Sequence, residues 1–532
     1  MYKRQFLCQY LGIPLVDGEE LTVRDDRVYL KTVSGLIRIH VIIRKISDTE
    51  SDPLTSSHQS PNGVPGLMEV VKAGNVQLLN PPGSGILEAY QLYKHRPDLC
   101  QQIMGAPLMI PSGHEHNIAC STSPTWQNGV LSPQPVKFRF YAFFDGESYQ
   151  VMPGGLATYQ TPSSTNLYCK DVWIITSRQN ASTVDANFIT RTHPIKRNTG
   201  LLSSRAADNL FWLGRYAERS EYATRMILEI VLNITEEEQR TDLASIKPIL
   251  TTLEQAHFLP KGFTKIPENS ENLQNLFYTL CSLFFYQPSL QGKGFDSIPN
   301  CLMQLTRLTT ASRARLSNEM SRIVRGAETL THSKLPKDFA KFRKTLVKAV
   351  LHYSAFNGTC LYNLTRTRGW HFIAIGKQIE SITWLVNLTN SALQSHPEAQ
   401  SSLLDSILSI NDSTLTYRFR YQSAPELAYV LDLVLYDPAN PRSLYTHINN
   451  IHKSLQVLFP EKESFNIPII LSVKKALSFL ETEIIQLETP ESYEQSILRL
   501  QKFMSAFQTE IPSLTEKLGW KCFTHVNYKS NI

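Results

Sequence analysis

The segment from Ser203 to Arg219 constrains the fold of this chain most, because its small and apolar residues recur with the period of an α-helix. On a helix these side chains form one continuous face, which other parts of the protein have to cover. That face continues past the segment and consists of Ala206, Leu210, Leu213, Ala217, Thr224, Ile227 and Val231. The pattern predicts a long amphipathic helix that packs within a larger helical domain.

The opposite side of the same helix is polar and aromatic. It consists of Arg205, Asn209, Trp212, Tyr216 and Arg219, with Arg215, Glu218 and Tyr222 beside them. The charged residues are compatible with a solvated face, on which an i,i+3 pair such as Arg215–Glu218 adds about 0.2–0.5 kcal/mol. The large aromatic residues instead favour a second packed face or a binding surface.

The chain changes character between residues 175 and 200. Before this point Gly and Pro are frequent and short β-type runs occur at 27–30, 37–43 and 136–141, whereas helical periodicity dominates after it. A chain of 532 residues is also too long for one hydrophobic core. We therefore predict an α+β region over residues 1–178, a linker over 179–200 and an all-α helical bundle over 201–525.

Charge and cysteine usage exclude several classes of protein. The formal net charge of +6 is small for this length, and the most basic stretch, 307–348, also contains acidic residues, so no nucleic-acid partner is expected. The eight cysteines include no Cys-x-x-Cys pair, which is typical of reduced thiols in the cytoplasm. No apolar run is long enough for a membrane span, so no membrane association is expected.

Three motifs in the helical part resemble those of a known family. They are the segment 203–219 with its Glu218–Arg219 pair, the segment 412–421 and the segment 430–444. From Leu201 to about residue 520 the chain resembles the bacterial alpha-E domains, which are helical domains named for a Glu-Arg pair.

These motifs supply the candidates for a polar cluster, namely Arg205, Asn209, Arg215, Glu218, Arg219, Tyr417, Arg418 and Arg420. We expect Arg215, Glu218 and Arg219 to converge with Tyr417, Arg418 or Arg420 in one partly buried cluster, because buried charges need partners. Such a cluster is either a structural network whose members satisfy one another, or a site for a ligand or protein partner.

The first motif also has a weak internal echo. The pattern Gly214-Arg215 followed by Glu218-Arg219 returns with the same spacing as Gly376-Lys377 followed by Glu380-Ser381. If the two segments face each other as a pseudo-symmetric pair, the second one has lost a planar bidentate donor, because Ser381 stands where the first has Arg219.

Short motifs within residues 6–177 follow the order and spacing of a second family. They include the segments 10–18, 21–25, 29–32, 52–54, 63–67, 73–76, 83–88, 151–156 and 170–173. This region resembles the C-terminal portion of the circularly permuted ATP-grasp family, which commonly precedes an alpha-E domain. The resemblance implies a partial ATP-grasp fold of the α+β class.

Members of that family use ATP and Mg²⁺ to phosphorylate a carboxylate, which an amine then attacks. The resemblance therefore implies an ATP-dependent carboxylate–amine, peptide-bond-forming ligase that acts on an amino acid or small peptide. Such chemistry needs cations and a glycine turn around the phosphates and oxygen ligands around the metal. The nucleotide candidates are Lys31, Arg44, Gly83, Ser84, Gly85 and Arg139, and the metal candidates are Asn75, Asn80 and Glu88.

Two departures from the family pattern bear on activity. The family has a large segment upstream of the point that corresponds to Met1, and between Ile110 and Trp126 this chain lacks the block with a lysine-containing strand. Without a phosphate-gripping lysine, the chain as it stands is expected to be an incomplete and inactive ligase. The alternative is a non-enzymatic interaction scaffold with a decayed ATP-grasp half, and no Ser/His/Asp or Cys/His pattern supports catalysis by the helical part alone.

Overall fold

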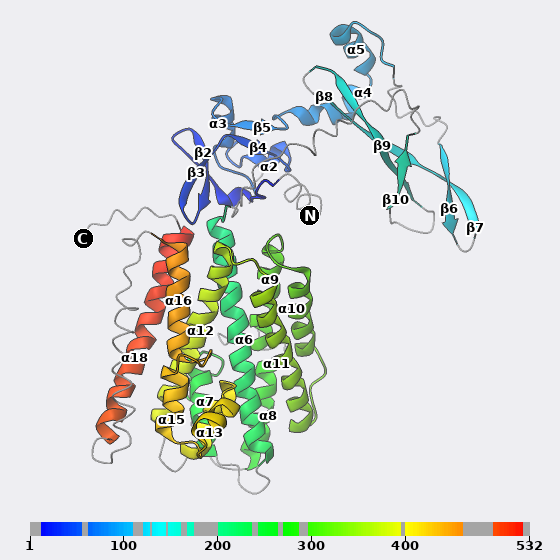
Figure 1. Ribbon diagram of the computed structural model, residues 1–532. Helices are drawn as coiled ribbons and strands as arrows, with labels where there is room; N and C mark the ends of the chain where they lie inside the picture. The colour runs from blue at the N-terminus through cyan, green and yellow to red at the C-terminus, as the bar shows by residue number, and fades with distance from the viewer. Residues whose placement is uncertain are drawn as a thin grey trace. The chain divides into compact units, whose positions relative to one another are not determined.

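The computed structural model describes residues 12–55, 62–109, 121–127, 130–144, 147–160, 167–174, 201–236, 243–263, 270–286, 296–394, 400–460 and 493–524 (Figure 1). Strands dominate its first part and helices its second part, which confirms the predicted fold class.

Contacts divide the chain into two compact units, one made of residues 1–80 and 199–532 and the other of residues 81–198. The expected linker, 179–200, lies outside the described residues, and the boundaries at 178 and 201 stay predictions. The contact-based division differs from them, since residues 1–80 group with the helices.

The first unit contains a small antiparallel sheet in the order β1–β2–β3, formed by Leu21–Arg24, Arg27–Thr32 and Gly35–Ile39. The turn between β1 and β2 consists of Asp25 and Asp26, which both have positive φ, as a tight hairpin with the right-handed twist of a sheet requires. Val28 and Leu30 of β2 form a small core with residues of α3 (Leu67–Lys72). Nearby elements are α2 (Asp48–Ser51) and the parallel pair of β4 (Val41–Ile43) and β5 (Gln77–Leu79).

The second unit is built from short helices and antiparallel strands. A three-stranded sheet has the order β10–β9–β8, and β6 pairs with β7 as a hairpin. The elements are a 3-10 helix at Ser84–Glu88, α4 (Tyr90–Tyr93), α5 (Arg96–Met104), β6 (Thr122–Gln127), β7 (Val130–Pro135), β8 (Lys137–Phe144), β9 (Tyr149–Gln160) and β10 (Leu167–Trp173).

Two long helices, α6 (Ser204–Glu236) and α12 (Arg368–Leu393), pack directly against each other in the helical bundle of the first unit (Figure 1). The other long helices are α7 (Leu243–Gln255), α8 (Ser270–Phe284), α9 (Ile298–Ala311), α10 (Asn318–Thr331), α11 (Phe339–Tyr362), α16 (Leu444–Leu458) and α18 (Tyr493–Leu518). Shorter elements are α13 (Gln400–Ile410), α14 (Thr414–Tyr421), α15 (Leu427–Leu431) and π-helical turns at Asp432–Tyr436 and Gly519–Thr524.

Helix α6 buries the face that the sequence predicts. Leu210, Leu213, Thr224, Ile227 and Val231 are each at most 1% exposed, so this prediction is confirmed. The helix also buries Phe211, Tyr222 and Met226, which lie outside that face. Because α6 is enclosed on most of its surface, its polar side chains have to find partners inside the bundle.

Helices α6 and α12 approach each other at two glycines. A Cβ atom on Gly214 would lie 2.2 Å from the carbonyl oxygen of Ile373, and one on Gly376 would lie 2.1 Å from the carbonyl oxygen of Phe211. Only glycine permits such a close approach of two backbones. Since Gly214 and Gly376 occupy the same position in the repeated motifs, the motifs face each other across this contact.

Candidate functional site

The motif Gly214-Arg215 with Glu218-Arg219 is the first motif here, and its echo, Gly376-Lys377 with Glu380-Ser381, is the second. The glutamate of the second motif, Glu380 on α12, binds two arginines of the first motif on α6. Its Oε2 lies 2.6 Å from Arg215 Nε, and its Oε1 accepts a hydrogen bond of 3.0 Å from Arg219 Nη1. The contact with Arg215 is an ion pair, not an aligned hydrogen bond. The Glu380 side chain is 1% exposed, so its charge depends on these two guanidinium groups.

The glutamate of the first motif, Glu218 on α6, binds the second motif in return. Its Oε2 lies 3.3 Å from Lys377 Nζ, and its Oε1 accepts a hydrogen bond of 2.7 Å from Ser381 Oγ. Each glutamate is therefore held by the first and last polar residue of the other motif. The two pairs differ in chemistry, because an ammonium and a hydroxyl stand where the other pair has two guanidinium groups.

Arg219 also fixes the turn that follows α7. Its Nη2 donates to the carbonyl oxygen of Ala256 at 2.6 Å, and its Nε donates to Asp296 Oδ2 at 2.8 Å. The guanidinium carbon lies 5.1 Å from the centre of the Phe258 ring. Burial alone would lower the pKa of Arg219, but the charges of Glu380 and Asp296 outweigh it and hold the pKa above its usual value. Arg219 therefore stays charged and satisfies the carbonyl group of Ala256, directly after α7.

A chain of polar contacts extends from Lys377 to a third buried carboxylate. Lys377 Nζ donates to the side-chain oxygen of Asn357, and Asn357 Nδ2 donates to Glu221 Oε2 at 2.8 Å. Glu221 Oε1 lies 2.9 Å from Arg225 Nε and 3.2 Å from Arg442 Nη2. Burial would raise the pKa of Glu221, but Arg442 and Arg225 outweigh it, so the pKa is lowered. Burial likewise opposes the charge of Lys377, and Glu218 outweighs it and raises the pKa of Lys377.

His447 on α16 lies near Lys377 and Arg442, two members of this chain of polar contacts. The ring is buried, and its Nδ1 is hydrogen-bonded to the side-chain oxygen of Gln378, while Nε2 has no partner among the described residues. Burial, with Arg442 and Lys377 nearby, lowers the pKa of His447 to about 3. The imidazole is therefore neutral at physiological pH.

The expected participation of Tyr417, Arg418 and Arg420 has to be corrected. Tyr417 Oη donates to the carbonyl oxygen of Ala424 at 2.9 Å, and Arg420 forms an ion pair with Asp437. Arg418 lies near Asp405, where burial raises the pKa of the carboxyl group and the charge of Arg418 partly opposes that rise. These residues belong to α14, a short helix whose polar side chains stabilise its own neighbourhood, so the cluster instead receives Glu380, Lys377, Ser381 and Asp296.

Two further candidates lie at the start of α6, away from the cluster. Arg205 is half exposed and pairs with Glu19 at 2.5 Å and with Asp17 at 3.8 Å. Asn209 is partly buried, and within the described residues no hydrogen bond links it to the cluster. Since both residues precede Arg215 by more than one turn of helix, their shared stripe does not bring them to the same partners.

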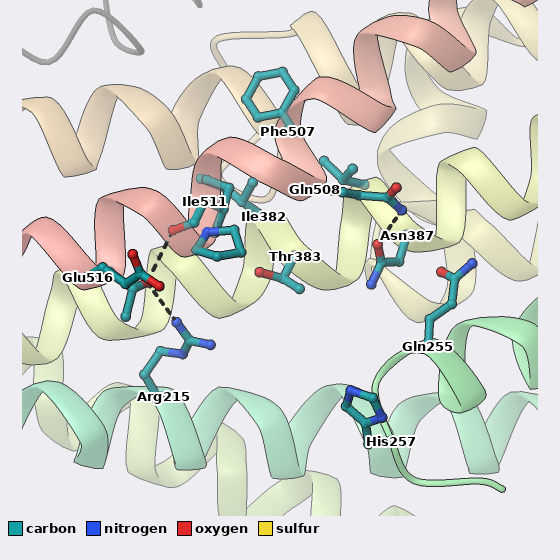
Figure 2. A pocket seen from close by; sticks show the side chains of 13 residues that line it. Arg215, Gln255, His257, Ile382, Thr383, Asn387, Phe507, Gln508, Ile511 and Glu516 are labelled. Carbon is teal, nitrogen blue, oxygen red and sulfur yellow. Dashed lines mark hydrogen bonds between the residues drawn. The ribbon is translucent and has the colours of Figure 1, made fainter. Parts of the chain in front are cut away.

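A cavity of about 680 Å³ opens beside Arg215, between α6, α12, α18 and the turn that follows α7 (Figure 2). Arg215 and Glu516 lie at one end of the view, and Gln255, His257, Asn387 and Gln508 lie toward the other end. The motifs contain Arg215 alone of these residues, because the remaining walls come from α7, α18 and the later turns of α12. A cavity that combines apolar and hydrogen-bonding side chains in its wall can bind a small molecule.

The nucleotide candidates of the first unit have ordinary surroundings. Lys31 is partly buried in β2, where it pairs in register with Leu36 of β3. Arg44 forms an ion pair with Asp48 and donates to Ser51 Oγ at 3.2 Å, so its mostly buried guanidinium is already used to fasten α2. Arg44 therefore does not fit a phosphate ligand. Asn75 Nδ2 donates to the carbonyl oxygen of Asp26 at 2.9 Å, which leaves its amide oxygen as the group that could face a cation.

The remaining candidates are exposed or belong to the second unit. Asn80 follows β5 and is exposed, and Gly83 has a φ of +83° just before the short 3-10 helix at Ser84–Glu88. Gly83, Ser84, Gly85 and Arg139 of β8 all lie in the second unit, and the side chain of Glu88 lies outside the described residues. The candidates are thus divided between two units, and their joint binding of ATP and Mg²⁺ stays a prediction.

Two classes of site are not found in the part of the chain that the structure describes. Three or more His, Cys, Asp or Glu side chains nowhere gather in a way that could hold a metal ion. None of the described helices combines the length and apolarity needed to cross a membrane.

Comparison with known proteins agrees with both resemblances. Residues 1–116 match the circularly permuted ATP-grasp type 2 family, and residues 202–523 match the alpha-E family, described as a predicted alpha-helical domain with a conserved ER motif. Uncharacterized proteins of Mycobacterium tuberculosis and Mycobacterium bovis are 25% identical over 86% of this chain and 60% of their own length.

An uncharacterized protein of Synechocystis is 38% identical over a shorter stretch, which covers 18% of this chain and 20% of that protein. The chain spans about 60% of the length of the mycobacterial relatives it matches. This chain has a Glu-Arg pair at Glu218 and Arg219, and both residues bind the second copy of the motif on α12. Because the family match extends over most of its length, the chain belongs to the alpha-E family, with an ATP-grasp-like region before the helical domain.

Proposed function

We propose that this chain is part of an ATP-dependent carboxylate–amine, peptide-bond-forming ligase, in which the helical bundle holds a substrate or protein partner. The observation that supports this proposal is the succession of an ATP-grasp-like region and an alpha-E domain in one chain. The ATP-grasp-like region would bind ATP and Mg²⁺, and an amino acid or small peptide in the cytoplasm would be the substrate. ATP supplies the phosphoryl group that activates a carboxylate.

The chemistry of the bundle supports a holding role. Burial raises the pKa of the Cys281 and Cys522 thiols to about 12 and that of Cys360 to about 11, so these thiols are protonated and poor nucleophiles at neutral pH. His447 is buried and neutral, and Arg219, Glu218 and Glu380 are held by one another's motifs. The proposal therefore places phosphoryl transfer in the ATP-grasp-like region and gives the bundle a holding role.

A nucleotide-binding experiment tests the proposal. We expect the purified chain to bind a fluorescent ATP analogue weakly in the presence of Mg²⁺, and the Lys31→Gln variant to lose most of this binding. Lys72→Gln is the matched control, because Lys72 is an exposed lysine of α3 in the same region. A phosphate contact made by Lys31 is worth more than tenfold in affinity, whereas the control should change affinity by less than about twofold.

ATP turnover is a separate readout. Because the chain lacks the block with the lysine strand, we expect no ATP hydrolysis above background, with or without an amino acid or dipeptide acceptor. Robust Mg²⁺-dependent turnover would refute the proposed inactivity. Nucleotide binding that is absent, or equal in both lysine variants, would refute the ligase assignment itself.

The alternative function is a non-enzymatic interaction scaffold. It is favoured by Leu415 and Phe419, which lie one turn apart on α14 and are 82% and 88% exposed. Two large apolar side chains in this position form a small contact surface for another protein. Failure of the chain to bind nucleotide would favour the interaction scaffold over the ligase.

A further inference from the structure

We infer that the cavity beside Arg215 is a binding site for a free α-amino acid, whose charged head lies between Arg215 and Glu516 and whose side chain extends toward Asn387 and Gln508. The inference deepens the proposed function and rests on it for the use of the bound molecule, since an amino acid held here would be a reactant of the ligase. The binding itself is argued from the lining of the cavity.

The size and walls of the cavity fit a small polar molecule. Its volume of about 680 Å³ falls within the range of roughly 300–1,000 Å³ that is usual for ligand pockets. Apolar side chains form much of its wall and would contact the methylene groups of a ligand: these are Ile382, Val386, Phe507, Ile511 and Pro512. The other lining residues are polar or charged, so the wall offers hydrogen-bonding groups that can orient a ligand.

The cationic group at one end of the cavity has donors to offer. Arg215 uses Nε for its ion pair with Glu380 and donates from Nη1 to Thr515 Oγ1 at a long 3.4 Å. Within the described residues its second terminal nitrogen, Nη2, makes no hydrogen bond to another side chain or to the backbone. A guanidinium has five N–H donors in a fixed plane, so Arg215 can bind a ligand carboxylate without releasing Glu380. Trp212, whose ring centre is 5.7 Å from the guanidinium carbon, supports the group from another side.

An anionic group lies at the same end of the cavity. Glu516 follows Thr515 on α18, and Figure 2 shows its carboxylate on the side of the cavity opposite Arg215. The two groups do not form an ion pair with each other in the described structure, although their charges are opposite. An α-amino acid has a carboxylate and an ammonium on one carbon atom, so it can bind Arg215 and Glu516 at the same time.

Amide groups line the other end of the cavity. Gln508 Nε2 donates to Asn387 Oδ1 at 2.8 Å, and Gln255 lies on the facing side (Figure 2). Side-chain amides both donate and accept hydrogen bonds, so they match a carboxamide at the end of a ligand side chain. We therefore choose L-glutamine as the probe.

His257 occupies a backbone position that favours glycine. It follows α7 with a φ of +63°, where Phe258 N donates to Leu253 O at 2.9 Å and His257 N donates to Glu254 O at 3.0 Å. Helices that end in this pattern usually have glycine at the position of His257, because a Cβ atom is strained there. Backbone conformation therefore does not explain why a histidine stands at this position in the lining of the cavity. Its imidazole can form a hydrogen bond with the carboxamide of the same ligand.

Calorimetric titration of the full chain with L-glutamine, without nucleotide, tests the inference. We expect a dissociation constant between roughly 10 μM and 1 mM. Nα-acetyl-L-glutamine lacks the ammonium and L-glutaminamide lacks the α-carboxylate, so each should bind at least about tenfold more weakly. Absence of L-glutamine binding up to about 10 mM, or equal affinities for the three compounds, would overturn the site.

Variants assign the two charges to their residues. Glu516→Gln should weaken L-glutamine and leave Nα-acetyl-L-glutamine unchanged, and Arg215→Lys should weaken L-glutamine and leave L-glutaminamide unchanged. Lys517→Gln is the matched control, because Lys517 neighbours Glu516 on α18 but does not line the cavity. If the charge variants weaken all three compounds equally, or not at all, the assignment is wrong.

A variant at His257 covers the case in which Arg215→Lys does not fold. Glycine suits a φ of +63°, so His257→Gly should fold as well as the parent chain and should bind L-glutamine several-fold more weakly. Unchanged affinity in a folded His257→Gly variant would count against the inference. None of these titrations contains ATP, so a failure here is distinct from a failure of nucleotide binding at Lys31.

Discussion

The contact between α6 and α12 has two halves with the same backbone geometry and different chemistry. In the half around Glu380, two planar guanidinium groups bind one carboxylate, and Asp296 shares one of them. In the half around Glu218, a lysine and a serine take those places, and Lys377 is bonded onward to Asn357. The comparison teaches that the glycine contact fixes the geometry of the helices, while the ion pairs can vary as long as each buried carboxylate keeps a cation.

The first and largest expected effect concerns the two glutamates. Glu380→Gln should lower the free energy of unfolding by about 3–5 kcal/mol, because Arg215 loses its ion pair and Arg219 keeps Asp296 as its one carboxylate partner among the described residues. Glu218→Gln should cost less, about 2 kcal/mol, because Lys377 retains Asn357 and Ser381 can still donate to an amide oxygen. Urea unfolding followed by far-ultraviolet circular dichroism measures both.

A control separates these losses from a general effect of removing a charge. Glu494→Gln in the exposed first turn of α18 should change the free energy of unfolding by less than about 0.5 kcal/mol. If Glu218→Gln proves as costly as Glu380→Gln, the two halves are equivalent in energy and the comparison fails.

The second prediction tests whether the backbone contact is common to both halves. Gly214→Ala and Gly376→Ala should each destabilise the bundle by about 2–3 kcal/mol, because the new methyl group would meet a carbonyl oxygen of the facing helix. Gly358→Ala on α11 is the matched control, since a Cβ atom there meets nothing within 4 Å, and it should stabilise by up to about 1 kcal/mol. A harmless alanine at either contact glycine would show that the helices can separate without cost.

The third prediction concerns pH in the half around Glu218. Unfolded His447 takes up a proton below its ordinary pKa of 6.5, whereas folded His447 does so only near its lowered pKa of about 3. The folded state binds fewer protons in this window, so its stability is complete above pH 6.5 and falls progressively as the pH drops toward 3.

The matched variant for this effect is His447→Gln, which has no ionisable group. Between about pH 6.5 and 5 the parent chain should lose about 1.5 kcal/mol more of unfolding free energy than this variant does. Denaturant unfolding at the two pH values measures the difference. Equal losses in both proteins would mean that the His447 proton is bound equally in the folded and unfolded states.

The sequence predicts the faces of α6 well and the neighbours of those faces poorly. Helical period alone identifies Leu213 and Ile227 as core, because it depends on residues close together in the chain. The same period places Arg215, Glu218 and Arg219 on polar positions, but it cannot tell which distant segment supplies their partners. The spacing of Gly376 and Glu380 did indicate the facing helix, whereas the resemblance of the segment 412–421 led to Tyr417 and Arg420, which have other partners.

Other parts of the site had no signal in the sequence. Asp296 and Arg442 lie in segments between helices and pair with Arg219 and Glu221. The path of such connecting segments cannot be predicted from helical periodicity. The cavity depends on how α18 lies against α12, and Thr515 and Glu516 belong to no motif. Residues that act through packing between distant helices need the folded structure to be recognised.

The long separation between paired residues affects synthesis of the protein. Arg219 and Glu380 are 161 residues apart in the chain, and Glu218 and Ser381 are 163 residues apart. While a ribosome produces this chain, α6 emerges well before the α12 residues that bind Arg215, Glu218 and Arg219. These contacts cannot form until α12 has been completed. Because domains fold when their last essential contact becomes available, the nascent bundle should stay open to chaperones and proteases through that interval.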